Sequence, residues 1–339
     1  MRYFRLAVVS FVATCLTAAL VLYAAPEESD EVVLRFRQNP GTAREYNYES
    51  EFDVRLSTDF GGIGEISQQL TTRNSFRLKQ KYVKGPSASG TGAEVNITYP
   101  EFIISNAMEL NLMGQATDKI EIVLSEDGVR QKAGGVVGPE DAAYDQILQT
   151  LRETGLAAII GVNGGIEDFN TQEIQDLNHP FKFASQLAAA VYNLHPLLPD
   201  KAIDIGDKWT AQFHCGGSAI PIEIDMECKM VGYEDVGTST NCIKIAVSHQ
   251  SKQNESEWLK ALGNMPAFFG GGDKQEGEIE IDFLTCNGIV FFSLTEGGIV
   301  QSEIKTEIEF KYTLNHQQMK DNKINGICRV QGKEIIKAK

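Results

Sequence analysis

The chain has 339 residues, of which 42% are hydrophobic, and its formal net charge at neutral pH is −15. A chain of this length forms one large or two medium-sized domains, and its apolar content suffices for a substantial core. The acidic excess repels nucleic acid and anionic lipid headgroups, so we expect no nucleic-acid partner.

The N-terminus has the pattern of an export signal. Two arginines precede an apolar run at 6–25, and an acidic stretch follows at 26–31. Such a pattern directs the remainder of a chain out of the cytoplasm. An apolar run of this length can also span a bilayer, so 1–25 is either a cleaved signal peptide or an N-terminal membrane anchor. We expect a periplasmic or cell-surface protein whose membrane contact is limited to this segment.

Residues 26–138 are expected to form a first β-rich half. A strand is predicted at 31–36, and 46–56 alternates between apolar and polar residues, which indicates a strand with one buried face. The return strand at 66–82 is more polar, and we expect it to face solvent on both sides. Further strands follow and end near residue 124.

The middle of the chain, 139–200, is expected to be helical. A proline and two acidic residues begin a predicted helix at 139–160, and glycines at 161–165 end it. A second helix is predicted at 180–195, where a proline follows and stops it.

The stretch 195–209 then joins this helical segment to a second β-rich half. Gly206 and Asp207 are expected to turn the chain into a strand that begins with Trp209. We expect the Trp209 side chain to pack beneath the second half, as large buried aromatic side chains do in cores.

The second β half is expected at 201–314. Asn287-Gly288 predicts a hairpin turn between two short strands. The segment 300–314 alternates along its whole length, which at ~3.3 Å per residue corresponds to about 50 Å, so the sheet must twist or curl. The tail at 315–339 is basic and weakly patterned, and we expect it to be loosely ordered.

Two cysteines have a spacing that suggests proximity. If 232–238 contains the turn of a hairpin, Cys228 and Cys242 lie nearly opposite one another, because residue 235 is their midpoint. They would then form either a disulfide or a pair of buried thiols.

Two octapeptides echo one another. Residues 124–131 and 294–301 share Leu, Glu, Gly and Gln at matching positions. The echo indicates either a duplicated β unit or two unrelated meanders with the same turn chemistry.

No catalytic or metal-binding motif is evident in the sequence. The five histidines lack the pairing of a metal site, and no nucleophile elbow, phosphate-binding loop or Cys-x-x-Cys motif occurs. We therefore expect no cofactor, no metal and no enzymatic activity. The candidate ligand-binding surface comprises Met265, Phe268 and Phe269, which precede three glycines. We expect these side chains to line the mouth of a cavity, to insert into lipid or to plug the sheet.

The stretch Leu198–Trp209 resembles the Leu-Pro-x-Lys-x-Val-x-Val-Gly-Asp-x-Trp stretch of a family of uncharacterised exported bacterial β-rich proteins, a domain of unknown function. An early Leu34-Arg35-Phe36 with Pro40-Gly41 also resembles that family. The resemblance implies a periplasmic or surface-exposed protein with no assigned chemistry. Many members are lipid-anchored, but Cys15 here does not stand in a lipoprotein acceptor context. In layout, the chain is also similar to the half-barrels of periplasmic lipoprotein carriers.

The predicted fold is therefore α+β, with a curved antiparallel sheet in two related halves and the central helices packed on one face. The predicted function is that of a non-enzymatic envelope protein. It would bind a hydrophobic small molecule, a lipid or a lipidated envelope protein between sheet and helices. The alternative is a structural or protein-interaction component of the envelope that is held by its N-terminal segment.

Overall fold

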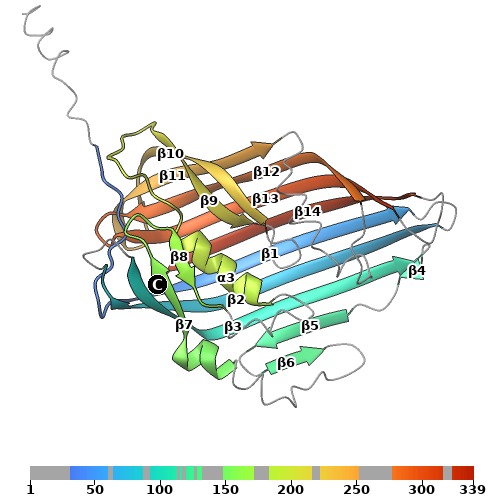
Figure 1. Cartoon of the computed structure of the whole chain (residues 1–339), viewed down its shortest axis with the longest axis horizontal. Helices are drawn as coiled ribbons and strands as arrows, with labels where there is room; N and C mark the ends of the chain where they lie inside the picture. The colour runs from blue at the N-terminus through green and yellow to red at the C-terminus, as the bar shows by residue number, and fades with distance from the viewer. Residues whose placement is uncertain are drawn as a thin grey trace, which may run out of the picture.

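The computed structural model describes residues 31–59, 64–86, 92–112, 115–116, 120–125, 128–131, 148–171, 183–215, 222–251, 277–315 and 323–339. This part of the chain is dominated by one antiparallel sheet (Figure 1). The predicted signal or anchor and the aromatic loop with Met265, Phe268 and Phe269 lie outside the described residues. Among the residues described, no helix is long and apolar enough to cross a membrane.

The sheet contains fourteen strands. They are β1 (Ala43–Asp59), β2 (Glu65–Lys84), β3 (Ala93–Leu112), β4 (Gln115–Ala116), β5 (Ile120–Ser125), β6 (Gly128–Gln131), β7 (Leu156–Ile160), β8 (Ile166–Phe169), β9 (Lys208–Cys215), β10 (Ile222–Val236), β11 (Ser239–Ser251), β12 (Gly277–Ser293), β13 (Gly298–Asn315) and β14 (Lys323–Ala338). Their main order is β6-β5-β3-β2-β1-β14-β13-β12-β11-β10-β9. The first and second halves of the chain therefore meet where β1 pairs with β14, from Tyr46 opposite Ala338 to Asp59 opposite Asn325.

The predicted α+β fold is wrong. The chain forms one continuous sheet across both halves, and its described helical segments are only η1 (Thr150–Thr154) and α3 (Phe183–Leu194). Helix α3 lies within the predicted 180–195. The described end of the predicted helix 139–160 instead becomes β7, which pairs with β3. Gly155, at φ +77°, ends η1 in a backbone conformation that suits glycine, and the chain continues as a strand.

The expectation that the return strand faces solvent on both sides is also wrong. Strand β2 buries every second residue along much of its length. These buried residues are Leu70, Thr72, Asn74, Phe76, Leu78, Gln80 and Tyr82. Polar and apolar side chains thus share the inner face, defined here as the face of the sheet that carries these residues. The alternation is visible in the sequence of β2 if Thr, Asn and Gln are counted among the residues that can face the interior.

The prediction of a loosely ordered tail is wrong for the last 17 residues, 323–339. Strand β14 is in the middle of the sheet, between β1 and β13. Its apolar alternation is interrupted by Gly326, Gly332 and Glu334. The two glycines leave room for the rings of Tyr312 and Phe52, which a Cβ at either position would overlap. The glycines that weaken the sequence pattern are therefore required by packing.

The predicted hairpin turn at Asn287-Gly288 is absent, because β12 runs without interruption through both residues. Gly288 lies between Val247 of β11 and Ile304 of β13, and a Cβ there would collide with the backbone carbonyl of Glu303. The glycine permits close approach of two strands rather than a turn. The predicted long strand at 300–314 is confirmed as part of β13, with Ile304, Ile308, Phe310 and Tyr312 buried.

Both octapeptides of the internal echo lie at hairpins, β5–β6 and β12–β13. The first hairpin is at one end of the sheet, whereas the second is in its interior. The two hairpins therefore share turn chemistry but do not occupy equivalent places in the strand order.

The sheet curls over at the β9 end. Strand β9 is five positions from β14 in the strand order, which in a flat sheet would separate them by about 24 Å. Yet the Asn193 side chain of α3 donates to the backbone carbonyl of His214 in β9 and to the carboxylate of Glu334 in β14. The edge strand is thus folded back over the inner face, and α3 and β9 are both seen in front of the sheet (Figure 1).

Candidate functional site

Helix α3 packs on the inner face through one apolar side. Leu187, Ala190, Val191 and Leu194 are buried at helical spacing. The Tyr99 hydroxyl of β3 donates to the backbone carbonyl of Leu187 at 2.9 Å. The alanine-rich sequence allows close approach, because small side chains keep the helix axis near the sheet.

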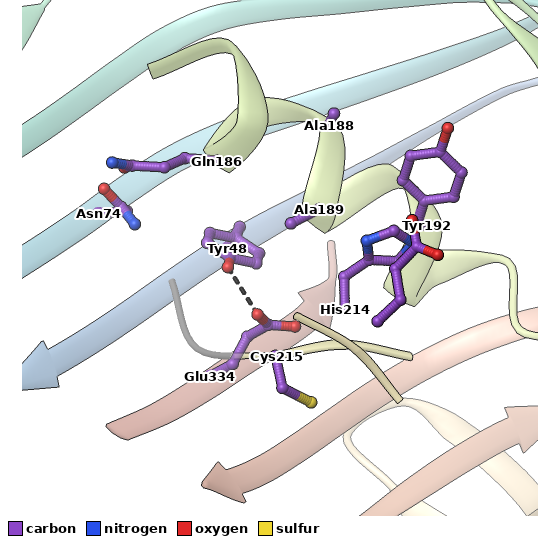
Figure 2. A pocket seen from close by; sticks show the side chains of 10 residues that line it. Tyr48, Asn74, Gln186, Ala188, Ala189, Tyr192, His214, Cys215 and Glu334 are labelled. Atoms are coloured by element: carbon purple, nitrogen blue, oxygen red, sulfur yellow. Dashed lines mark hydrogen bonds between the residues drawn. The ribbon is translucent and has the colours of Figure 1, made fainter. Parts of the chain in front are cut away.

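A cavity of about 280 Å³ lies between α3 and the sheet (Figure 2). Its lining combines side chains from the helix, from the three central strands β1, β2 and β14, and from β9 and β10 at the folded-over edge. The lining residues are Tyr48, Asn74, Gln186, Ala188, Ala189, Tyr192, His214, Cys215, Glu223 and Glu334. The cavity is therefore a product of the curl and of the helix together.

Glu334 is the ionisable group at the centre of this site, with only 5% of its surface exposed. Its carboxylate accepts a hydrogen bond from the Tyr48 hydroxyl at 2.7 Å and another from the Asn193 Nδ2 at 2.6 Å. Burial raises the pKa of Glu334 to about 7, although both hydrogen bonds act in the opposite direction. Desolvation thus outweighs the two donors, and the carboxyl group is poised between its protonated and ionised forms at neutral pH.

Asn193 fixes the geometry around this carboxyl group. Besides donating to Glu334, its side chain accepts from the backbone N–H of His214 and donates to the backbone carbonyl of the same residue, both at 2.7 Å. The His214 ring stacks on Tyr192 with centroids 4.1 Å apart. Burial lowers the pKa of His214 to about 4, so its imidazole is neutral at neutral pH.

Two amide side chains in the lining have unused hydrogen-bonding groups. Gln186 is 2% exposed, and neither its Nε2 nor its Oε1 has a partner in the described part of the chain. Asn74 is 4% exposed; its Nδ2 donates to the Ser50 hydroxyl at 2.8 Å, and its Oδ1 has no partner there. In Figure 2 both amides lie to one side of Tyr48, with Tyr192 and His214 on the other. The cavity therefore has one end with unsatisfied donor and acceptor groups.

A thiol pair connects the edge strand β9 to β12. The side chains of Cys215 and Cys286 are hydrogen-bonded, and this contact together with burial raises the pKa of Cys215. The Cys286 Sγ also lies 3.5 Å from the Thr306 hydroxyl. A raised pKa disfavours the thiolate, so Cys215 is a poor nucleophile in the fold.

The predicted joint residues lie apart from this cavity. The peptide N–H of Gly206, at φ +100°, donates to the backbone carbonyl of Met230, and the Asp207 carboxylate accepts from the peptide N–H of Asp204. They form the turn that precedes β9. Trp209 is only half-buried at the margin of the core, and its Nε1 donates to the backbone carbonyl of Leu197 at 3.2 Å. It shares the parity of the buried Ala211 and Phe213 on β9 and packs against the core, but only at its margin and not fully beneath the second half.

The two stretches that carry the family resemblance are in contact. The Arg35 guanidinium donates to the backbone carbonyls of Pro199 and Asp200 at 2.8 and 2.7 Å. The backbone of Val32 bridges to that of Ile203. Residues 31–36, predicted as a strand, form only this isolated bridge, so they are an extended segment that secures the joint to the rest of the fold.

The proposed disulfide between Cys228 and Cys242 is not formed. The hairpin turn is at residues 237–238 and the strand pairing contains two register shifts, so Cys228 is opposite Val247 and Cys242 is opposite Glu234. The two thiols also belong to different hydrophobic clusters. Both cysteines are buried and free. The two thiols are out of register because the turn is centred between residues 237 and 238 and not at 235; the two register shifts offset one another.

The residues of the cavity were not identified by sequence analysis. The three on the central strands, Tyr48, Asn74 and Glu334, are on the buried parity of their strands, where a polar side chain is costly unless it is partnered. A polar residue on the buried parity of a strand is therefore the feature of the sequence that could have indicated this site. Gln186 precedes Leu187 on α3, and nothing in the sequence indicates that it faces the sheet. No group of three His, Cys, Asp or Glu residues suited to a metal occurs among the described residues.

Comparisons with known proteins add little to this geometry. No protein-family model matches the chain, and no curated protein matches it. One similar solved structure is of lipovitellin and concerns its lipid–protein interactions; it has 11% sequence identity to this chain and a TM-score of 0.38. The similarity covers 89% of this chain and 25% of that chain. A likeness at this level establishes neither a shared fold nor a shared function.

Proposed function

We propose that the protein is a non-enzymatic binding protein of the cell envelope that holds an apolar or amphiphilic small molecule between α3 and the inner face of the sheet. The observation that carries this proposal is the cavity beneath α3, whose buried Gln186 and Asn74 have unsatisfied polar atoms. The export pattern at 1–25 supports a place outside the cytoplasm.

The unsatisfied amides favour a ligand on energetic grounds. A buried donor or acceptor without a partner costs about 1–3 kcal/mol, and a ligand that completes its hydrogen bonds recovers part of that cost. The volume of about 280 Å³ is near the lower end of the roughly 300–1,000 Å³ typical of small-molecule sites. The site is thus large enough for a small ligand or for the polar end of a larger one.

The cavity itself offers apolar contacts beside its polar groups. Ala188 and Ala189 of α3 line it, together with the rings of Tyr48 and Tyr192. A ligand with an apolar part would bury apolar area against them at about 25 cal/mol per Å². This mixed lining supports an amphiphilic ligand.

The chemistry of the lining supports binding rather than catalysis. The Glu334 carboxylate is held by two donors, and the Cys215 pKa is raised. His214 has its pKa lowered to about 4 and its ring stacked on Tyr192. The Tyr48 hydroxyl is hydrogen-bonded to the Glu334 carboxylate, but burial raises the pKa of Tyr48 well above its usual value, which disfavours its activation as a nucleophile.

The proposal is tested by filling the cavity. The full chain is purified, extracted lipids are identified by native mass spectrometry, and binding of a fluorescent alkyl-chain probe is measured after delipidation. Ala189→Trp places a large ring in the cavity and is expected to weaken binding at least about tenfold, a loss of about 1.4 kcal/mol. Ala157→Trp makes the same change at an exposed position of β7 and is expected to leave binding unchanged.

Unchanged probe affinity in Ala189→Trp would place the ligand elsewhere. A complete absence of probe binding and of co-purified lipid would refute the binding function and favour the structural or interaction role. Urea unfolding of both variants shows whether a loss of affinity merely reflects a loss of fold.

A further inference from the structure

We infer that the ligand is a single-chain amphiphile with an uncharged, hydroxyl-bearing headgroup, and that Gln186 and Asn74 recognise this headgroup in the cavity beneath α3. This inference rests on the proposed binding function and specifies its ligand class. It is carried by three observations: the unused hydrogen-bonding groups, the charges in the lining and the size of the cavity.

The unused groups require a ligand that both donates and accepts. Gln186 presents one carbonyl acceptor and one NH₂ donor, and Asn74 presents its carbonyl oxygen because its Nδ2 is engaged by Ser50. Ionised carboxylates and phosphates only accept hydrogen bonds, so they would leave both carbonyl oxygens unsatisfied. An ammonium group only donates and would leave the Gln186 Nε2 unsatisfied. A hydroxyl group does both.

The charges in the lining disfavour an anionic headgroup. Glu334 and Glu223 both line the cavity, and the described lining residues include no lysine or arginine. The two donors nearest Glu334, from Tyr48 and Asn193, are already engaged by its carboxylate. A fatty-acid carboxylate would therefore meet carboxyl groups without a compensating cation, which is unfavourable in a site of low polarity.

The cavity size indicates that only the headgroup enters it. About 280 Å³ accommodates a glycerol-sized group, whereas ligand sites for complete drug-sized molecules reach about 1,000 Å³. The first carbons of the alkyl chain would contact Ala188, Ala189 and the Tyr192 ring, and the rest of the chain would lie outside the cavity. A neutral glycerol ester with one acyl chain has these properties: hydroxyl groups at one end, no charge, and one alkyl chain.

The experiment compares four probes with the same oleoyl or oleyl chain, added to the delipidated full-length protein below their aggregation concentrations. They are 1-monooleoylglycerol, oleate, oleylamine and oleoyl-lysophosphatidylcholine, and each is measured by displacement of the fluorescent alkyl probe. Monooleoylglycerol is expected to bind at least about tenfold more tightly than any of the other three.

Gln186→Met keeps the length of the side chain and removes both hydrogen-bonding groups. It is expected to weaken monooleoylglycerol binding about tenfold and to leave oleate affinity unchanged. Gln331→Met makes the same change at an exposed position of β14 and should have no effect. Matching urea midpoints establish that each variant is folded.

The possible failures are distinguishable. Binding of oleate, oleylamine or the lysophospholipid as tightly as monooleoylglycerol would overturn the headgroup assignment and leave the binding function standing. An equal loss for all four probes in Gln186→Met would also overturn it. Absence of binding by every probe, together with the absence of any lipid co-purified from the producing cells, would overturn the proposed function itself.

Discussion

The protonation of Glu334 should make a measurable contribution to the pH dependence of folding. Burial raises its pKa from the usual 4.5 to about 7. Because each pKa unit corresponds to about 1.36 kcal/mol, this change represents about 3 kcal/mol of coupling between proton binding and folding. Glu334 is only 5% exposed, so solvent screening reduces this figure little.

The sign follows from which state holds the proton more tightly. The folded chain binds the Glu334 proton more tightly than the unfolded chain does, because its pKa is higher in the fold. The stabilisation is therefore fully present below about pH 4.5 and is lost as the pH rises through about 7. Glu334→Gln mimics the protonated side chain in shape and charge, and it removes this dependence.

Two buried histidines contribute with the opposite sign. Burial lowers the pKa of His195 to about 3 and that of His214 to about 4. Their stabilisation is present above the usual value of 6.5 and is lost as the pH falls towards those lower values. The wild-type curve contains all three contributions, so only the difference between wild type and Glu334→Gln isolates the carboxyl group.

The assay is urea unfolding of both proteins between about pH 4.5 and about pH 8.5. Relative to wild type, Glu334→Gln should gain about 3 kcal/mol of unfolding free energy across this range as the pH rises. Glu49→Gln is the matched control, because Glu49 is exposed and on the opposite parity of the adjacent strand β1. Parallel curves for wild type and Glu334→Gln would refute the buried, protonated state of this group.

Three further outcomes are expected. Trp209→Ala should lower the unfolding free energy by about 2 kcal/mol, which is less than the 3–5 kcal/mol of a fully buried aromatic residue because Trp209 is only half-buried. Urea unfolding measures this loss, and a value above about 4 kcal/mol would contradict the edge position of Trp209. Deletion of 323–339 should abolish cooperative unfolding, since it removes the strand that joins the two halves, and a cooperative transition in the truncated chain would contradict this topology. Non-reducing peptide mapping should find Cys228 and Cys242 alkylated after denaturation in iodoacetamide, whereas a linked peptide would contradict the strand register.

Alternation of apolar residues was sufficient to predict individual strands. Residues 46–56 and 300–314 were correctly assigned to strands with one buried face, because side chains of a strand point alternately to its two faces. The same rule gave the wrong environment for β2, where Thr72, Asn74 and Gln80 occupy the buried face. Apolar–polar alternation is hard to recognise in a strand whose buried face itself carries polar side chains.

Glycines were the second source of error. Gly288 and Gly332 have the local sequence signature of a turn or of irregular structure, yet both are inside long strands. Their role depends on Glu303 and Phe52, which come from other strands. A local pattern cannot show which distant segment will approach a given glycine.

The β-rich character of the protein, the position of α3, the long alternating strand β13 and the net negative charge follow from the sequence alone. Each of these depends on local periodicity or on total composition. The tertiary structure alone decided that both halves form one sheet and that the C-terminal segment is its central strand. It also decided that the curl brings Glu334, His214 and Gln186 around one cavity. These features depend on pairing between residues far apart in the chain, which hydrophobic alternation does not encode.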